Sequence, residues 1–372
     1  MTAAWRLPRP LHPAAWWLWA LCLAIAAMRT TNPLLLLLIA AVAGFVVAAR
    51  RPNAPWSKSY GAFVKLGLLV LLLRVLIEVL FGSGGPGRIL VHLPGVPLPD
   101  WMAGVRIGGP VTGDQLARAA YDGLQLAVLL CCVGAANALA SPARLLKLMP
   151  GALYEAGVAV TVALSFAPQA VASVSRIRAA RRLRGRPSHG LQAWRGLAVP
   201  ILEEALERSV DLAAAMDTRG FGRRGDVSTP VRVTTATLTL GGLITMTAAS
   251  YFLVGQGASR AVALPLLVAG ALAATFGLLL GGRRTKRTRY RPDPWRSPEW
   301  IVTFSGLSVV VLVSLVAHID QAGLAPTTTP LVPPTLPLLA TVGVLMGLLP
   351  AWAAPVQTPR RRPVATPVGA TT

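Results

Sequence analysis

Residues 175 to 224 read SRIRAARRLRGRPSHGLQAWRGLAVPILEEALERSVDLAAAMDTRGFGRR, the longest polar interval in an otherwise strongly apolar chain. Two of its segments, Leu183-Arg184-Gly185 and Thr218-Arg219-Gly220, have the sequence of a helix end. The helix dipole favours a cation in the last turn, and glycine takes the left-handed backbone conformation that commonly follows the helix. The interval therefore predicts two helices, each terminated by an Arg-Gly pair.

The helix before the second ending has the clearer pattern. Pro200 suits a first helical position, Glu203 and Glu204 bring negative charge to the opening turn, and Gly220 follows the last periodic residue. At about 100° per residue the charged side chains fall on one face. The opposite face is apolar and small, with Leu202, Ala205, Leu206, Ser209, Leu212, Ala213 and Met216. This pattern predicts an amphipathic helix that lies in water or at a membrane surface.

The composition of the whole chain indicates the class of protein. Of 372 residues 54% are hydrophobic and only 13% are charged, which is typical of a protein that crosses a membrane several times. The net charge of +22 would suggest nucleic acid in a soluble protein, but the sequence has neither zinc-ligand spacings nor basic patches interleaved with aromatic residues. We therefore attribute the positive charge to loops on the cytoplasmic side of a membrane and expect no nucleic-acid partner.

Long apolar runs predict an all-α polytopic membrane protein with about eight transmembrane helices and a cytoplasmic region inserted between the fourth and the fifth. The predicted spans are 14–28, 34–49, 61–81, 115–139, 233–254, 261–281, 300–317 and 336–354. The segment 152–175 is also apolar, but Pro168 interrupts it and both flanks are basic. We expect it to be a kinked helix that dips into or lies along the cytoplasmic half of the bilayer.

Charge and turn residues divide the chain into successive regions. Residues 141–232 contain fourteen Lys and Arg against seven acids, so this part is expected in the cytoplasm together with both termini. The protein is therefore expected in the cell membrane. The predicted regions are 1–140 with an outer loop near 82–115, the polar region 141–231, spans in 232–282, a basic loop 283–299, two spans in 300–354 and a disordered tail 355–372.

One pair of charged residues lies inside a predicted span. Arg74 and Glu78 are four residues apart, on one face of a helix, where charges are costly unless they pair. A structural ion pair that fixes helix packing is the preferred interpretation. The alternative is a secondary transporter that uses this pair at a midplane site, although the broken helices and internal repeat of such proteins are not evident.

Catalytic and metal-binding patterns are missing from the sequence. The cysteines Cys22, Cys131 and Cys132 lie in apolar runs, and the four histidines have no partner at ligand spacing, so we predict no metal site and no cofactor. A membrane-embedded enzyme is a weaker alternative, because no cluster of acids or Ser-His-Asp arrangement can be assembled. The chain also has no Gly-Lys-Ser/Thr phosphate loop, so ATP hydrolysis would have to come from a partner.

The two helix endings and several short motifs give the chain a family resemblance. It resembles the transmembrane T component of energy-coupling factor transporters, the family that includes the cobalt-transport Q subunits. The likeness covers roughly residues 10 to 280. The motifs that carry it are Leu11-His12-Pro13, Asn32-Pro33, Gly109-Pro110-Val111-Thr112, Pro142-Ala143-Arg144-Leu145-Leu146, Pro150 and Arg219-Gly220-Phe221-Gly222.

The resemblance implies partners and a mechanical role. In the family, each of two coupling helices ends in a motif usually written Ala-Arg-Gly, whose arginine docks into a cytoplasmic ATPase subunit. The matching triplets here are Leu183-Arg184-Gly185 and Thr218-Arg219-Gly220, with Arg181 or Arg182 as alternatives in the first. The implied partners are two cytoplasmic ABC ATPases and a substrate-binding membrane S component. The implied function is uptake of a vitamin or a transition-metal ion, without an enzymatic activity of this chain.

Overall fold

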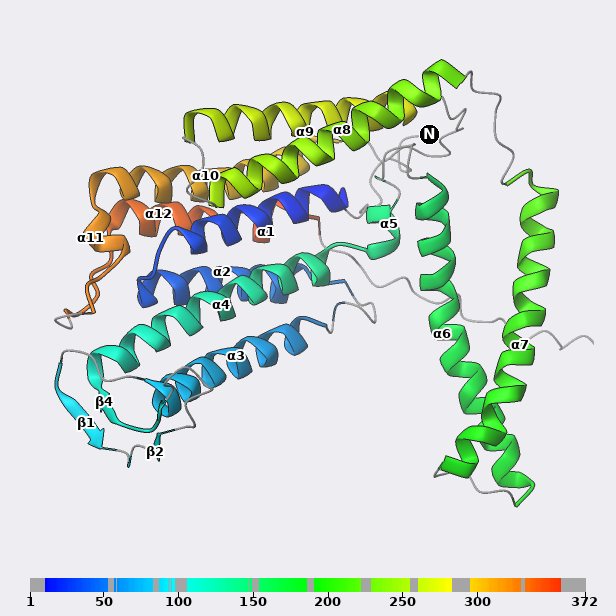
Figure 1. Cartoon of the computed structure of the whole chain (residues 1–372), viewed down its shortest axis with the longest axis horizontal. Helices are drawn as coiled ribbons and strands as arrows, with labels where there is room; N and C mark the ends of the chain where they lie inside the picture. The colour runs from blue at the N-terminus through cyan, green and yellow to red at the C-terminus, as the bar shows by residue number, and fades with distance from the viewer. Residues whose placement is uncertain are drawn as a thin grey trace, which may run out of the picture. The chain divides into compact units, whose positions relative to one another are not determined.

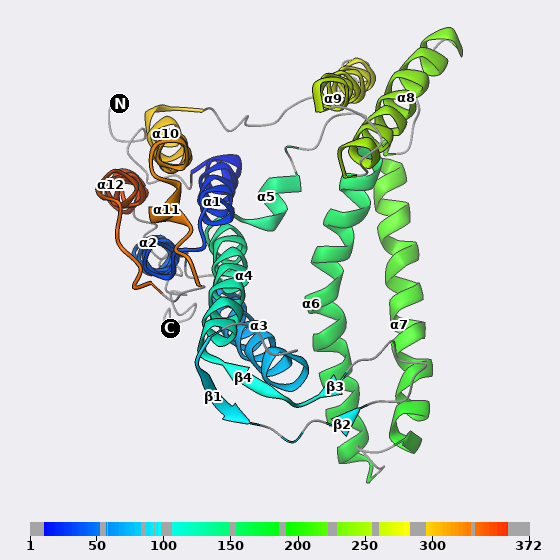
Figure 2. The ribbon, with the colours of Figure 1, turned by 60° about the vertical axis from the view of Figure 1, so that its left-hand side comes forward.

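The computed structural model describes residues 11–52, 57, 59–82, 87–92, 94, 96–97, 106–146, 148, 154–185, 191–221, 229–254, 260–282, 295–328 and 332–355. In this part of the chain helices dominate, and the chain is an all-α polytopic membrane protein as predicted (Figures 1 and 2). It divides into two compact units. Unit 1 comprises residues 1–142 and 292–372, and unit 2 comprises residues 143–291. The predicted basic loop and disordered tail fall mostly on 283–294 and 356–372, outside the described residues.

All eight predicted spans contain helix, but they are not the same set as the helices that are long and apolar enough to cross a membrane. In the described part of the chain, six helices are long and apolar enough to cross a membrane by length and composition: Pro33–Arg50, Gly113–Leu139, Ala156–Leu183, Val233–Val254, Ala261–Gly282 and Ser297–Ile319. The apolar helices Pro13–Met28 and Leu338–Ala353 are shorter, and the helix over 61–81 is not among the six. The segment expected to lie along the membrane is part of one of the six. Pro168 does not end this helix, because an internal proline removes one hydrogen bond and kinks the backbone without stopping it.

The first two helices of unit 1 begin where local sequence signals place them. Helix α1 (Pro13–Met28) and helix α2 (Pro33–Arg50) both have proline at the first helical position. Asn32 caps α2, since its side chain accepts a hydrogen bond of 3.0 Å from the backbone N–H of Leu34. The tight turn between the helices makes them an antiparallel hairpin.

Helices α3 (Ser59–Phe81) and α4 (Gly113–Leu139) form the second hairpin of unit 1, and α4 also packs on α1 and α2. The predicted outer loop joins α3 to α4 and contains short strands. Strand β1 (Ile89–His92) pairs antiparallel with β4 (Pro110–Thr112), and β2 (Val96–Pro97) pairs with β3 (Arg106–Ile107). The connection is therefore a nested β-hairpin at one end of the helix pair (Figure 1).

The C-terminal helices return to unit 1. These are α10 (Ser297–Ile319), α11 (Gln321–Leu324), α12 (Leu338–Met346) and α13 (Pro350–Ala353), so the last predicted span consists of two short helices. Helix α10 packs along α1, and α12 packs on both α10 and α2. The shared core contains fully buried side chains from both ends of the sequence, including Trp19, Leu23, Leu35, Ile39, Val309, Val313 and Val344.

Unit 2 contains two helix pairs. Helix α6 (Tyr154–Leu183) and helix α7 (Leu191–Thr218) form the first, and α8 (Thr229–Val254) and α9 (Arg260–Gly282) form the second. A short helix, α5 (Pro142–Leu146), precedes them. The prediction that Pro200 begins the second coupling helix is wrong, because α7 begins at Leu191 and Pro200 lies inside it. The turns before Pro200 are in contact with α6, since Gly196 lies against the Arg181 guanidinium, and Leu197 in the same turns is buried.

Candidate functional site

The end of α7 is a Schellman motif built around Gly220. Gly220 has a φ of 74°, in the left-handed region that favours glycine. The backbone N–H of Gly220 donates to the carbonyl of Asp217 at 2.8 Å, and that of Phe221 donates to the carbonyl of Met216 at 3.0 Å. These are the two hydrogen bonds that define the motif. Thr218 is consequently the last helical residue, and Arg219 occupies the cap position.

The end of α6 repeats this geometry. Gly185 has a φ of 69°, and its N–H donates to the carbonyl of Arg182 at 3.1 Å. Leu183 is the last helical residue, so Arg184 holds the cap position that Arg219 holds in α7. The predicted left-handed glycine after each arginine is confirmed. The two triplets are therefore equivalent in backbone geometry as well as in sequence.

Both cap arginines are accessible to solvent. Arg184 and Arg219 are exposed, and neither side chain makes a hydrogen bond or an ion pair with another residue that the structure describes. Their neighbours are also open, since Leu183 is 89% exposed and Thr218 is exposed. Each helix thus presents an accessible guanidinium on a backbone that the glycine fixes.

The structure distinguishes the alternative arginines of the first ending. The guanidinium of Arg181 lies against α7, where a Cβ atom placed on Gly196 would clash with it. The Nε atom of Arg181 is buried and makes no hydrogen bond to the described residues. Arg182 is exposed, but it lies inside the last helical turn rather than at the cap. Arg184 is therefore the residue that matches Arg219.

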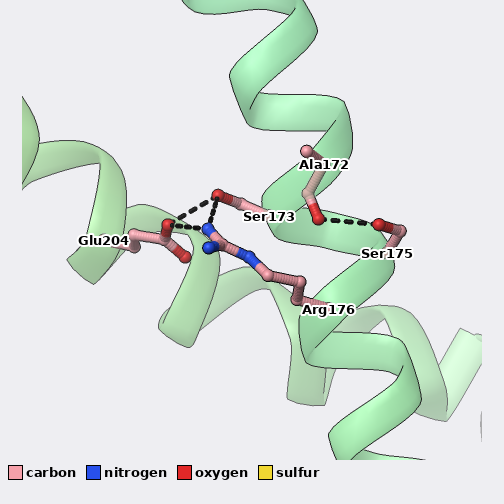
Figure 3. A network of polar contacts seen from close by, with 5 residues as sticks. All are labelled: Ala172, Ser173, Ser175, Arg176 and Glu204. Carbon is pink, nitrogen blue, oxygen red and sulfur yellow. Dashed lines mark hydrogen bonds and ion pairs between the residues drawn. The ribbon is translucent and has the colours of Figure 1, made fainter. Parts of the chain in front are cut away.

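A small polar network joins α6 to α7 (Figure 3). Glu204 of α7 accepts a hydrogen bond of 2.6 Å from the hydroxyl of Ser173 and forms an ion pair of 2.8 Å with Arg176. The guanidinium of Arg176 also donates to the Ser173 hydroxyl at 3.0 Å. Ser173 is buried, whereas the Arg176 side chain is 69% exposed. Glu204, predicted only as a charge in an opening turn, thus contacts both Ser173 and Arg176 of the neighbouring helix.

These contacts show how the two endings are arranged. Ser173 faces Glu204 and Arg181 faces Gly196, so α6 and α7 run antiparallel. They meet near the end of α6 and the start of α7 and separate toward their other ends (Figure 1). The path along α6 from Ser173 to Leu183 and along α7 from Glu204 to Thr218 is roughly 35 Å at about 1.5 Å per residue. The two Arg-Gly endings therefore lie at opposite ends of the pair.

A second cluster of charges lies between α3 and α4 in unit 1. Arg74 forms the predicted ion pair with Glu78 at 2.8 Å, and its second nitrogen contacts Asp122 of α4 at 3.3 Å. The Asp122 side chain is 43% exposed on this unit. The prediction from sequence missed Asp122, because its partner lies on another helix. The signal was available, since Asp122 is an acid within a predicted span.

A metal site is not found among the described residues. No group of three or more His, Cys, Asp or Glu side chains in this part of the chain could hold a metal ion. Cys131 and Cys132 are buried free thiols, and Cys22 is half-buried. The site that the structure does present consists of two exposed arginines, one at the end of each helix of the α6–α7 pair.

The six long apolar helices define a multi-pass membrane protein, and its role in transport follows from a family match. The family of cobalt transport proteins, CbiQ, matches residues 6–230, from before α1 to the start of α8. The chain belongs to this family. A comparison with curated proteins found no match.

Proposed function

We propose that this chain is the transmembrane coupling subunit of an energy-coupling factor importer. In this role it transmits the motion of two cytoplasmic ATPase subunits to a separate substrate-binding membrane subunit. Membership of the cobalt transport family supports the transport role and is consistent with a chain that performs no chemistry of its own. The residues that carry coupling are Leu183, Arg184 and Gly185 at one end and Thr218, Arg219 and Gly220 at the other.

The observation that carries the proposal is the equivalence of the two endings. Both have arginine at the cap and left-handed glycine next, and they lie at opposite ends of an antiparallel pair. An antiparallel helix pair has an approximate twofold axis between its helices. Two identical partners related by a twofold axis can therefore bind the two endings in the same way. ABC ATPases that close as a pair have this symmetry.

Arginine at a cap position suits docking. A guanidinium presents several donors in a rigid plane and forms bidentate, charge-assisted hydrogen bonds with a carboxylate or with backbone carbonyls. The Schellman motif fixes the backbone from which Arg219 projects, which lowers the entropy lost on binding. A groove with acceptors on an ATPase subunit would therefore bind each ending through a single well-positioned side chain.

The contact between α6 and α7 is weak enough to let the two helices move relative to each other. Ion pairs that water reaches contribute about 0–1 kcal/mol, so the Arg176–Glu204 pair is a weak restraint. Small residues at the contact, such as Gly196 and Ser173, allow the helices to slide with little steric resistance. Movement of the ATPases could then change the crossing of the pair, as in shear motions of packed helices.

The proposal also includes the side of the membrane on which the two Arg-Gly endings lie and the kind of substrate that is transported. The excess of arginine and lysine in 141–232 supports a cytoplasmic position for both endings and both termini in the cell membrane. In unit 1, residues His12, Arg50, Glu299 and Ala351 lie at one end of the helices, which supports placing the termini on the same side. The substrate would be a vitamin or a transition-metal ion such as cobalt, bound by the separate S component.

The stoichiometry of the purified complex tests this function. The tagged chain is co-expressed with the ATPases and the small membrane protein encoded by neighbouring genes, purified in mild detergent and weighed by native mass spectrometry. We expect two ATPase subunits for each copy of this chain, one for each Arg-Gly ending. A complex with a single ATPase, or a chain that purifies without any, would refute the proposal.

A further inference from the structure

The C-terminal helices are the part of unit 1 that the family match leaves out. The match ends at residue 230, whereas α10–α13 occupy 297–353. These helices nevertheless pack on α1 and α2 and share their core. In lipid, apolar surface alone gives little preference for one helix neighbour, so close packing and interhelical hydrogen bonds determine which helices associate. The contacts of the C-terminal segment with α1 and α2 therefore show how specific this association is.

The first set of contacts is at the turn between α1 and α2. The carbonyl of Leu324, at the end of α11, accepts hydrogen bonds from the Thr30 hydroxyl at 2.7 Å and from the backbone N–H groups of Thr31 and Asn32 at 3.0 and 3.1 Å. The Asn32 amide donates to the carbonyls of Gly323 at 2.8 Å and Thr335 at 2.6 Å. Asn32 is 0% exposed. Without the C-terminal segment these buried donors would lose their acceptors, which costs about 1–3 kcal/mol for each such group.

The second set of contacts is at the opposite end of the same helices. The backbone N–H of His12 donates to Glu299 at 3.3 Å, and Glu299 also accepts from the N–H of Arg296 at 3.0 Å, capping α10. Arg50, the last residue of α2, donates through Nε to the carbonyl of Ala351 at 2.7 Å. Between the two ends, the indole of Trp19 donates to the carbonyl of Gly347 at 3.1 Å. The C-terminal segment is thus bound along the full length of the hairpin.

Close backbone packing accompanies these hydrogen bonds. Gly306 of α10 lies directly against α1, because a Cβ atom at this position would be 2.9 Å from the Cα of Trp19 and 3.2 Å from the Cβ of Cys22. A side chain as large as leucine could not occupy this position without separating the helices, whereas a single Cβ atom requires only a small shift. The contact therefore requires a small residue at one point and specific hydrogen bonds at both ends.

We propose that residues 295–355 are a built-in membrane subunit. They bind the α1–α2 hairpin through a specific interface that holds without a covalent connection, and they close this face of the hairpin to any separate membrane protein. The segment that connects them to the rest of the chain, 283–294, serves only as a tether. This inference does not depend on ATPase docking, and its test gives a result whether or not the ATPases are present.

The test cuts the tether in the intact protein. A protease site is inserted after residue 287, and the full chain is expressed, purified in mild detergent and then cleaved. We expect the fragment that begins at residue 288 to remain bound to the larger fragment during size-exclusion chromatography. Gly306→Leu should release it, whereas Gly61→Leu should not, because a Cβ atom on Gly61 of α3 meets nothing within 4 Å.

A disulfide gives a second readout that does not rely on the Leu variant folding. In Gly306→Cys the new Cβ would lie 3.2 Å from that of Cys22, close to the separation of about 3.5–4.5 Å found in disulfides. Oxidation in native membranes, followed by cleavage, should leave the two fragments linked on a non-reducing gel. The same experiment with Cys22→Ala should leave them separate. Fragments that part after cleavage, or a Gly306→Cys protein that links no better than this control, would overturn the proposal.

Discussion

Gly220 determines where the Arg219 side chain can point, because it lets the backbone turn sharply after the last helical residue. Its φ of 74° places it in a region that costs a residue with a Cβ about 1–2 kcal/mol, and more for a β-branched one. A substitution of Gly220 would therefore disturb the position of the Arg219 side chain without removing the side chain itself. The glycine and the arginine can therefore be tested separately.

Gly220→Val should weaken ATPase binding although Arg219 is unchanged. If a conformational cost of at least about 1–2 kcal/mol must be met when the ATPase binds, affinity falls by at least about 5- to 30-fold. Titration of the purified chain in nanodiscs with the labelled ATPase pair would measure this change. Gly241→Val is the matched control, because Gly241 lies within α8 and a Cβ atom there meets nothing within 4 Å. Equal affinities for Gly220→Val and the control would contradict the role given to the left-handed glycine.

In the cluster of Arg74, Glu78 and Asp122, replacing one residue and replacing all three should have different effects on stability. Arg74→Met leaves two carboxylates near each other without their cation, so we expect a loss of about 1–3 kcal/mol in stability. Replacing all three residues by Met or Leu removes the unpaired charges and should restore most of it. Thermal unfolding in detergent would compare the two variants. If the triple variant is stable but no longer supports uptake when the ATPases still bind, the cluster takes part in transport and is more than a structural clamp.

At the residue scale, features that depend on neighbouring residues in the sequence were predictable, whereas contacts between helices were not. The helix endings at Gly185 and Gly220 were predictable, because the cap, the dipole and the left-handed glycine are all local effects. The Arg74–Glu78 pair was also local, being four residues apart on one helix. Asp122 and Glu204 were missed as partners because each binds a residue of another helix. Such contacts follow from how helices pack rather than from spacing along the chain.

At the scale of elements, the α8–α9 pair shows how closely two helices can approach. A Cβ atom on Gly242 would clash with the backbone of α9 at Ala274, and one on Gly270 would lie 2.8 Å from the backbone nitrogen of Met246. The two helices therefore touch backbone to backbone, a mode of packing that small residues permit within membranes. Gly241, the next residue along α8, faces open space.

Gly242→Leu should separate α8 from α9, whereas Gly241→Leu should have little effect. Both variants add the same side chain to adjacent positions of one helix, so hydrophobicity and helix propensity are matched. We expect Gly242→Leu to lower the midpoint of thermal unfolding in detergent by several degrees relative to Gly241→Leu, as overpacking costs about 1–3 kcal/mol. Indistinguishable midpoints would show that this contact does not stabilise the protein.

The elements themselves were largely predictable, and their ends less so. Every predicted span contains helix, since periodicity and composition report on burial in lipid or protein, but 336–354 holds two short helices. The long apolar helix Ala156–Leu183 was not counted among the predicted spans. The signal of Pro200 misplaced the start of α7, because the turns before Pro200 are also helical and contact α6, where the Arg181 guanidinium lies against Gly196. The strands between α3 and α4 were not foreseen, because Gly- and Pro-rich sequence indicates a connection without specifying its pairing.

At the scale of the whole molecule, the chain leaves unit 1 near residue 142 and returns to it near residue 292. The region with the two Arg-Gly endings is therefore an insertion that is connected to unit 1 on both sides. Composition alone could not predict this. The apolar character of α10 and α12 indicates burial in the membrane. Which helices they pack against depends on contacts of Gly306, Asn32 and Trp19, which are far apart in the sequence.

Sidedness gives a prediction for the whole molecule. Helix α6 has the length and composition to cross a membrane, whereas the proposed function requires Arg184 and Arg219 on the same, cytoplasmic side. In a background with Cys22, Cys131 and Cys132 replaced by Ala, Arg184→Cys and Arg219→Cys should both react with a membrane-impermeant maleimide in inverted vesicles only. Labelling of position 184 in right-side-out cells would mean that α6 crosses the membrane and that the two endings cannot dock to one ATPase pair.

The most direct test of the central claim is retention of the ATPase pair by charge-reversed chains. The double variant Arg184→Glu, Arg219→Glu changes both cap arginines, and Arg182→Glu, Arg208→Glu makes the same change in charge at exposed arginines of the same two helices. With each chain purified from co-expressing cells, we predict that the cap variant retains less than about a tenth of the wild-type ATPase, because each lost charge-assisted contact costs about 1.5–3 kcal/mol. The control should retain nearly all of it. Undiminished ATPase on the cap variant, or equal loss from both variants, would contradict the claim that these two arginines couple the chain to its ATPases.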